Sequence, residues 1–443
     1  MRVQLKKISG KISLASCALL QVSSPAAVAA EGWDVDSAFL YYAESGGRVS
    51  AFEPSVRAQV DLGDDEYINF QVVVDALTGA TPNGAHKSTV VQTFTEPSGG
   101  SKSDDDGESE GEYTVKPGEL PLSKTFRDTR LAVTGEWNKP INRLSSVLLG
   151  ASFSSEVDYT SLGGSATYEY NFNNKNTTLA AGAAVTFDTI NPIGDIPSGL
   201  NPMRRATSDQ QRLGNSDTKT STDFILGVTQ IINRSTLVQL NFTHGISSGY
   251  QNDYNKVLSV IDPNTNEPLV GAWLDVNDLP YLFEQRPDKR TRDIVFIRGV
   301  HHLTEDVINL SYRYYTDDWG IDSHTVNLRY RYELGSSKYL QPHIRYYTQT
   351  SADFYKHDLV QGTDIDASGN VNLRYASSDY RIGAFDSVTY GLSYGMKLSK
   401  NSKFSLRGEY MQQMNDNSKV PRPGEATPDL SAVILQATYS IAW

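Results

Sequence analysis

The sequence has almost no cysteine, since the single one among its 443 residues is Cys17. That cysteine lies in an N-terminal segment with four basic residues in its first eleven positions, a modestly apolar stretch, and small residues at 26–30. This order is typical of a secretory signal peptide, so we expect residues 1–30 to be cleaved. The mature chain would then contain no cysteine, which excludes disulfides and a covalently attached c-type haem.

A lipoprotein processing box is the alternative at this terminus, because residues 14–17 read LASC. The apolar stretch between Lys11 and Cys17 is shorter than the roughly seven residues that such a signal needs. The apolar character also continues beyond the cysteine. Lipidation at Cys17 is therefore not expected.

The sequence also lacks a long apolar run and an excess of basic residues. After residue 30, no stretch approaches the about 18 consecutive apolar residues of a transmembrane helix. Lys and Arg number 40 against 52 Asp and Glu, which gives a formal charge of −12. Because binding of phosphates needs clustered Lys and Arg, nucleic acid is excluded as an expected partner. Membrane strands stay open, since each needs only about ten residues of alternating character.

Alternation with a period of two is what the sequence does contain. Between positions 326 and 334, apolar residues occupy the even positions and polar residues the odd ones. Comparable alternation recurs at 68–74, 308–314 and 388–396. This period predicts extended strands with two chemically different faces, and no helical period of similar strength is present.

Short and long connections take turns between the alternating segments. The short ones are rich in Gly, Asn, Asp and Pro, which favours tight turns, and they lie at 63–66, 138–142, 173–176, 233–234, 304–306, 335–338 and 400–402. The long ones lie near 77–125, 189–219, 246–291, 351–386 and 415–429.

This asymmetry predicts an all-β fold, a transmembrane antiparallel β-barrel of about sixteen strands that spans residues 31–443. Its turns would be periplasmic, its long loops extracellular, and its environment the lipid and lipopolysaccharide of a Gram-negative outer membrane. A secreted β-sandwich or propeller would also alternate. It would explain neither the unequal connections nor the 25 tyrosines, which suit the aromatic girdles of a membrane barrel.

The C-terminal run ends on an aromatic residue at the last step of its alternation. Tyr439, Ile441 and Trp443 would face lipid, while Gln436 and Thr438 would face the lumen. A final strand of this pattern resembles the signal that outer-membrane barrels present to their assembly machinery. We therefore expect that machinery to be a partner of this chain.

Three stretches resemble a family of uncharacterised bacterial outer-membrane proteins that is defined only as a domain of unknown function. They are residues 41–54 (YYAESGGRVSAFEP), 77–85 (LTGATPNGA) and 121–130 (PLSKTFRDTR). The resemblance extends over nearly the whole mature chain and implies an outer-membrane barrel in a Gram-negative envelope. It also implies genes nearby for small lipoproteins, thioredoxin-like periplasmic proteins and a flavin transferase. It supplies no activity and therefore no catalytic residue.

Side chains on the strand faces opposite the apolar ones would line the lumen. One group is mainly basic and includes Glu333 and Glu409; its other members are Arg313, Arg329, Arg331, His343, Arg345, Lys397 and Arg407. A second group on early strands contains Glu53, Arg57, Asp61 and Asp75. A basic wall across from an acidic wall would create a transverse field that sets charge preference in a water-filled pore. The alternative is that these charges only neutralise one another and hydrate the interior.

Three further motifs are weaker. The acidic run 104–112 could attract a hard cation such as calcium, but Lys102 would occupy the first ligand position of an EF-hand. His244 lies near Ser247 and Ser248, which are the residue types of a membrane lipase, yet such a histidine is more often an ordinary interfacial residue. His301 and His302 are adjacent on a strand, so they point to opposite faces and cannot share a metal.

The sequence thus predicts a porin-like channel for small polar or charged solutes, with no enzymatic activity and no cofactor. Two alternatives stay open. The barrel could be a sleeve for a partner in an envelope redox or electron-transfer system, with a periplasmic lipoprotein or redox protein as that partner. It could instead be a non-conducting surface receptor or adhesin that uses its long loops.

Overall fold

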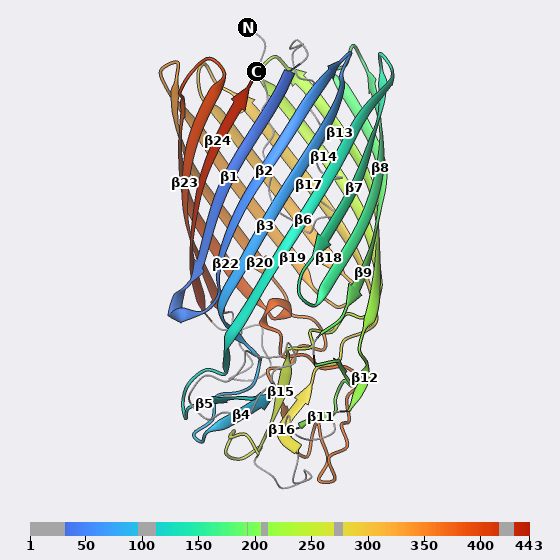
Figure 1. Ribbon diagram of the computed structural model, residues 1–443, viewed down its shortest axis with the longest axis vertical. Coiled ribbons are helices and arrows are strands. Elements are labelled where there is room, and N and C mark those ends of the chain that lie inside the picture. Colours follow the sequence, from blue (N-terminus) through green and yellow to red (C-terminus); the bar gives the residue numbers. More distant parts are fainter. Residues whose placement is uncertain (1–31, 96–111, 193, 205–210, 270–277, 416–428) are drawn as a thin grey trace.

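A computed structural model describes residues 32–443 except 96–111, 193, 205–210, 270–277 and 416–428. Sixteen antiparallel strands close into a barrel, as the alternation predicted (Figure 1). The barrel strands are β1 (Gly32–Glu44), β2 (Ser50–Gly63), β3 (Glu66–Pro82), β6 (Leu122–Asn142), β7 (Ser145–Ser155), β8 (Tyr159–Phe172), β9 (Thr177–Ile190), β13 (Asp217–Asn233), β14 (Thr236–Gly249), β17 (Lys289–His302), β18 (Val307–Asp317), β19 (Asp322–Leu334), β20 (Lys338–Gln349), β22 (Phe385–Lys397), β23 (Ser402–Asn415) and β24 (Leu430–Ala442).

The first and last strands form the seam that closes the barrel. β1 pairs with β24 from Asp34 opposite Ala442 to Glu44 opposite Ala432. At the end of the seam, Trp33 and Trp443 exchange two backbone hydrogen bonds of 2.9 and 3.0 Å. Both termini of the described chain therefore lie at the same end of the barrel (Figure 1).

All seven predicted turns lie at that end, as predicted, whereas the connections at the other end are mostly long and are short only at 45–49, 156–158 and 318–321. Two of these turns depend on positive φ, which Asn and Asp tolerate better than most residues. Asp64 and Asp65 have φ of 52° and 65°, and Asn173 and Asn174 both have φ of 55°. Because outer-membrane barrels keep their short turns in the periplasm, this end is periplasmic.

The outer face of the barrel is apolar, and aromatic residues lie near its ends. Trp33, Trp137 and Trp443 are 47, 39 and 63% exposed at the periplasmic end. Apolar side chains such as Leu328 and Leu392 are exposed at every second position between them. Exposed apolar surface of this extent matches hydrocarbon rather than water, and a closed barrel leaves no unpaired strand edge in lipid.

The long connections fold into a cap at the opposite, extracellular end (Figure 1). The short strands of the cap pair among themselves rather than with the barrel, and they are β4 (Gln92–Thr95), β5 (Glu112–Val115), β10 (Ile196–Pro197), β11 (Pro202–Arg204), β12 (Arg212–Gly214), β15 (Val257–Ile261), β16 (Asp278–Phe283) and β21 (Asp358–Val360). Two 3-10 turns complete the described elements, η1 (Ser45–Gly47) and η2 (Tyr380–Ile382).

The cap has apolar cores of its own. One cluster contains Phe94, Val257, Tyr281 and Phe283, all at most 3% exposed. A second contains residues of β15, β16 and β21 that are fully buried, among them Leu258, Val260, Leu282 and Leu359. Burial on this scale stabilises a defined structure, so the cap is a folded unit and not a set of separate loops.

β3 and β6 extend past the neighbouring strands toward the cap. Sequence patterning ended the strand before the first long connection near Leu77. In the structure this strand, β3, continues to Pro82, which lies opposite Leu122 of β6. Gly79 permits this continuation, because its φ is +122° and an added Cβ would lie 2.4 Å from the carbonyl oxygen of Arg48. Only glycine tolerates that backbone at so close an approach. Residues 79–82 of β3 and 122–126 of β6 therefore form a two-strand stalk that leads the first long connection into the cap.

Two features predicted from sequence lie outside the described residues. They are the signal peptide at 1–30 and nearly all of the acidic run 104–112. Within the part of the chain that is described, no helix is both long and apolar enough to cross a membrane.

Candidate functional site: the charged lumen

The strand registers place the predicted basic side chains inside the barrel. Arg313 lies opposite Thr325, Arg329 opposite His343, and Arg345 opposite Thr389. The intervening positions, such as Leu328 and Ile344, are exposed on the outside. By the same parity the remaining members of the group also face the lumen, namely Arg331, Glu333, Lys397, Arg407 and Glu409.

The second predicted group also faces the lumen, on β2 and β3. Glu53, Arg57 and Asp61 share the inner face of β2 with Gln59, which lies opposite Asn69 of β3. Asp75 lies opposite Arg130 of β6 and accepts a hydrogen bond of 2.7 Å from its Nε. Arg57 donates to Asn69 at 3.1 Å. This wall is therefore acidic but largely paired within itself.

Four arginines on neighbouring strands carry the basic wall. Among the ion pairs of the described residues, none includes Arg298, Arg313, Arg329 or Arg345. They lie close enough to influence one another, since Arg329 interacts electrostatically with Arg298, Arg345 and Arg407, and also with Glu409. The cations outside ion pairs make this wall of the lumen positive.

His343 and Glu409 form the polar centre of this wall. The Nδ1 of His343 lies 3.0 Å from Glu409 Oε1, and its Nε2 lies 2.7 Å from Asn327 Oδ1. Arg407 approaches the same carboxylate at 3.6 Å. Glu409 is therefore shared by His343 and Arg407 and neutralises only part of the wall.

Sequence patterning missed three lumen arginines, which are Arg290, Arg292 and Arg298 on β17. Their strand has apolar residues on both faces, since Ile294 and Phe296 point inward while Val295 and Ile297 point outward. Alternation is lost where both faces are apolar, so parity could not be assigned. The lysine and arginine content of 289–298 was the available signal.

The wall formed by β7, β8 and β9 carries small lumen-facing side chains. Gly150 lies opposite Ser165, and Gly163 lies opposite Ser152 and Thr186. In the circle of sixteen strands, β7 lies across from β20 and β9 lies across from β23, which carry Arg345 and Arg407. These two arginines therefore face a wall of small residues.

The turn η2 lies at the extracellular mouth and joins the cap to the barrel (Figure 1). The amide of Gln349, the last residue of β20, donates to the carbonyl oxygens of Arg381 and Gly383 at 3.1 and 2.6 Å. The ring of Tyr380 lies 5.3 Å from the guanidinium of Arg48, beside the end of β1. The turn therefore bridges two parts of the rim.

A buried ion network holds η2 in this position. Arg286 contacts Glu284 at 2.7 Å and Asp379 at 2.9 Å, and all three side chains are at most 9% exposed. Arg381 binds both Asp379, at 2.7 Å, and Asp253. Burial alone would raise the pKa of Asp379, but the charges of Arg381 and Arg286 outweigh it and hold that pKa well below its usual range. Asp379 therefore stays ionised as the anchor of the network.

An acidic cluster lies on the opposite part of the rim, between β7 and β8. Burial, followed by the charge of Asp128, raises the pKa of Glu156 to about 7. Burial also raises the pKa of Asp158, which accepts a hydrogen bond from the hydroxyl of Tyr254 in the cap. This part of the rim therefore changes charge near neutral pH.

The raised pKa of Glu156 predicts a pH-dependent stability. An acid whose pKa is raised in the folded state adds most to the free energy of unfolding below its unfolded-state pKa, here about 4.5. This stabilisation is lost as the pH rises through 7. Glu156→Gln should remove this loss, so thermal unfolding in detergent should separate wild type from variant progressively between pH 4.5 and 8. Glu305→Gln, in a periplasmic turn, is the control. Parallel profiles for wild type and Glu156→Gln would contradict the assignment.

The C-terminal residues lie as the alternation predicted. Tyr439 is 40% exposed and Trp443 63% exposed on the outer face, and Ile441 shares that face opposite Val35. Their recognition by an assembly machinery is a property that we propose from this exposed pattern.

The remaining histidine motifs form no catalytic arrangement. His244 pairs with Asp293 at 2.8 Å on the outer face of the barrel. Ser247 points into the lumen, where it contacts Ser221 at 2.9 Å, so it lies on the opposite face of β14 from His244. His301 contacts Thr236 at 2.9 Å through its Nδ1. A lipase-like pairing of His244 with Ser247 is therefore not formed.

The closed barrel, its apolar outer face and its charged lumen define an outer-membrane β-barrel protein. The chain belongs to the family described as "Protein of unknown function (DUF3570)", whose match covers residues 9–441. No curated protein matches the sequence.

Several solved outer-membrane proteins are similar to the chain at low identity. OpdK from Pseudomonas aeruginosa, solved with vanillate, is 8% identical with a TM-score of 0.37, over 93% of this chain and 98% of that one. The CymD monoaromatic hydrocarbon channel is 7% identical with a TM-score of 0.39, over 98 and 91%. A bacterial polysaccharide outer-membrane secretin is 6% identical with a TM-score of 0.42, over 93 and 98%.

Proposed function

We propose that the protein is a water-filled, anion-preferring channel for small polar solutes across the outer membrane. The observation that carries the proposal is the group of lumen arginines outside the ion pairs of the described residues, Arg298, Arg313, Arg329 and Arg345. A barrel of sixteen strands is wide enough for an aqueous interior. Arg331 and Arg407 keep about 30% of their side chains exposed within it.

The two walls differ in charge, and this difference supports a preference for anions. Cations gathered on one wall of a low-dielectric pore concentrate anions there and repel cations. The paired acids of β2 and β3 offset this field less than their number suggests, because Asp75 is already neutralised by Arg130. Carboxylate or phosphate groups on a small solute match the geometry of exposed guanidinium groups.

Conductance measurements test the proposal. Purified mature protein in planar bilayers should give discrete current steps, and a KCl gradient should give a reversal potential of the sign for chloride preference. The steps should persist when soluble partners are absent. Silent bilayers, or a potassium-selective current, would refute an anion channel. Silence combined with co-purification of a haem or flavin protein would favour the sleeve function instead.

The folded cap supports a second candidate, a surface receptor. Its cores of Phe94, Tyr281 and Leu359 give the extracellular end a defined shape that could recognise a ligand. A silent barrel that still binds an extracellular molecule through the cap would support this alternative.

A further inference from the structure

Three potential metal ligands meet in the cap, from connections that are distant in sequence. His86 follows the stalk strand β3, while His357 and Asp358 belong to the connection between β20 and β22. Among the described residues, this is the group in which three such ligand atoms lie within 4.8 Å of one another. The group belongs to the cap and is separate from the charged lumen.

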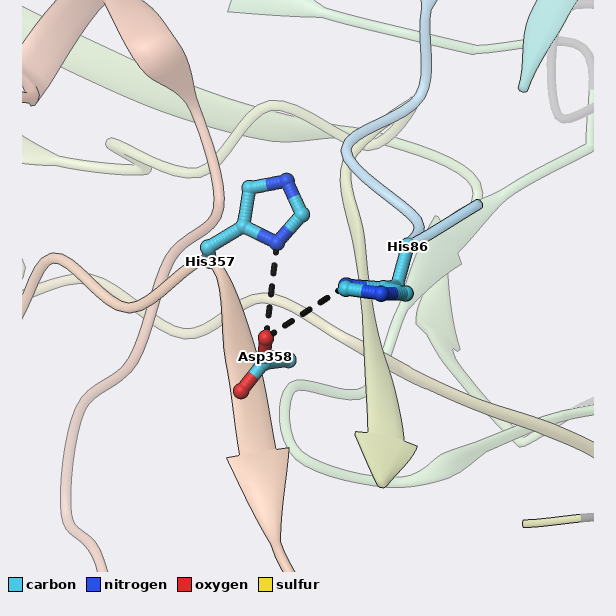
Figure 2. Close-up of side chains that lie close together, drawn as sticks. All are labelled: His86, His357 and Asp358. Carbon is cyan, nitrogen blue, oxygen red and sulfur yellow. Dashed lines mark ion pairs between the residues drawn. The ribbon is translucent and has the colours of Figure 1, made fainter. Parts of the chain in front are cut away.

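Both imidazole rings present Nδ1 to the same carboxylate oxygen (Figure 2). The distance to Asp358 Oδ2 is 3.6 Å from His86 Nδ1 and 3.5 Å from His357 Nδ1. Both distances exceed those of ordinary N–H···O hydrogen bonds, about 2.7–3.2 Å. The two Nδ1 atoms are buried and have no hydrogen-bond partner in the structure. Buried polar atoms without a partner are costly, so this arrangement needs an explanation.

A bound metal ion explains these distances. Zinc lies about 2.0–2.2 Å from nitrogen and carboxylate ligands in tetrahedral sites, which separates neighbouring ligand atoms by about 3.4 Å. The observed separations of 3.5 and 3.6 Å are close to that value. The rings are nearly perpendicular, at 83°, with centroids 5.4 Å apart, so they do not stack against each other.

We propose that His86, His357 and Asp358 bind one divalent transition-metal ion of the zinc type. Two imidazole nitrogens and one carboxylate suit zinc, copper or nickel, whereas calcium and magnesium prefer oxygen ligands alone. Three protein ligands leave a fourth tetrahedral position for water or an external ligand.

The backbone around the ligands is already fixed by the cap. The amide of His86 donates to Ser259 Oγ at 2.9 Å, and its carbonyl accepts from Gln92 at 2.9 Å. Asp358 lies opposite the same Ser259 in the parallel pairing of β15 with β21. The histidine and the carboxylate are therefore positioned against one shared residue, and binding needs little rearrangement.

Just before His86, glycine is required. Gly84 has a φ of +90°, and an added Cβ would lie 1.9 Å from Ser378 Oγ and 3.0 Å from the carbonyl oxygen of Val257. This close packing directs the chain from the stalk to the ligand position. The ion would then join the end of the stalk to the connection between β20 and β22, and would stabilise the cap across the barrel mouth.

Metal titration of the full mature protein in detergent tests the site. After treatment with a chelator, Co²⁺ should produce the visible absorption of a tetrahedral complex, at one ion per chain, and Zn²⁺ should displace it. His86→Gln and His357→Gln should each weaken Zn²⁺ binding more than about 100-fold, because loss of a mere supporting residue costs 10–100-fold. Affinity should also fall at acid pH, because only a neutral imidazole binds a metal ion.

His244→Gln is the matched control, since it removes a histidine paired with Asp293 on the outer face and should leave Zn²⁺ binding unchanged. Circular dichroism of each variant establishes that the barrel is retained, and Asp358→Asn provides a third ligand variant. Absence of Co²⁺ absorption in the wild type would overturn the site. Equal Zn²⁺ affinity in His86→Gln and wild type would overturn it too. Neither result depends on conductance, so the site and the channel fail separately.

Discussion

Replacing Arg329, Arg331 and Arg345 together by glutamine should move the reversal potential toward that of a cation-selective pore. The three side chains line the lumen on β19 and β20, and two of them belong to no ion pair of the described residues. Removal of three positive charges from one wall weakens the field that concentrates anions in the lumen. The ratio of chloride to potassium permeability should fall about threefold or more, since fields inside charged clefts reach several kT.

Lys139→Gln is the control for this experiment. Lys139 lies on the outer face near the periplasmic end, where it pairs with Glu66 at 2.7 Å, so its loss removes a charge without altering the lumen. Raising the salt concentration should reduce the difference between wild type and the triple variant, because the fields are screened. An unchanged reversal potential in the triple variant would show that the basic wall does not set selectivity.

Replacing Arg286 by methionine should release the cap from the barrel mouth. Arg286 is 9% exposed at its side chain and binds Glu284 and Asp379, each 1% exposed. Its removal leaves the buried Glu284 without its arginine and leaves Asp379 with Arg381 alone, a loss of about 3–5 kcal/mol. The cap should become sensitive to protease while the barrel keeps its β-type circular dichroism.

A second substitution separates charge from packing in this network. Glu284→Gln in the Arg286→Met background removes the charge that has lost its arginine, so protease resistance should recover in part. Arg381→Gln should have a smaller effect, because its side chain is 57% exposed. Equal protease resistance in wild type and Arg286→Met would mean that apolar cores alone hold the cap.

The barrel could be predicted from sequence because the alternation of apolar and polar residues is visible within each single strand. Each strand such as β19 places alternate residues in hydrocarbon and in the lumen, so parity alone assigned Arg329 and Arg345 to the inside. β17 shows where this fails, since Phe296 faces the lumen and Ile297 the outside. Strand parity was thus predictable only where the two sides differ in polarity.

The cap could not be predicted because its residues are buried on both faces. β15 reads VLSVI, and every residue of it is buried, so the alternation that reports a barrel strand is absent. The candidate metal ligands are equally hidden, because His86 and His357 lie in different connections and match no short motif. Their proximity arises from the parallel pairing of β15 and β21, which is a tertiary contact.

The seam between β1 and β24 has a consequence for biogenesis. It joins the two ends of the chain, so it carries the largest loop-closure entropy of any pairing in the barrel. Until that pairing forms, a growing sheet exposes two open edges that can capture other chains. Closing this seam removes both edges at once, and a barrel without β24 would be left with a permanent aggregation-prone edge.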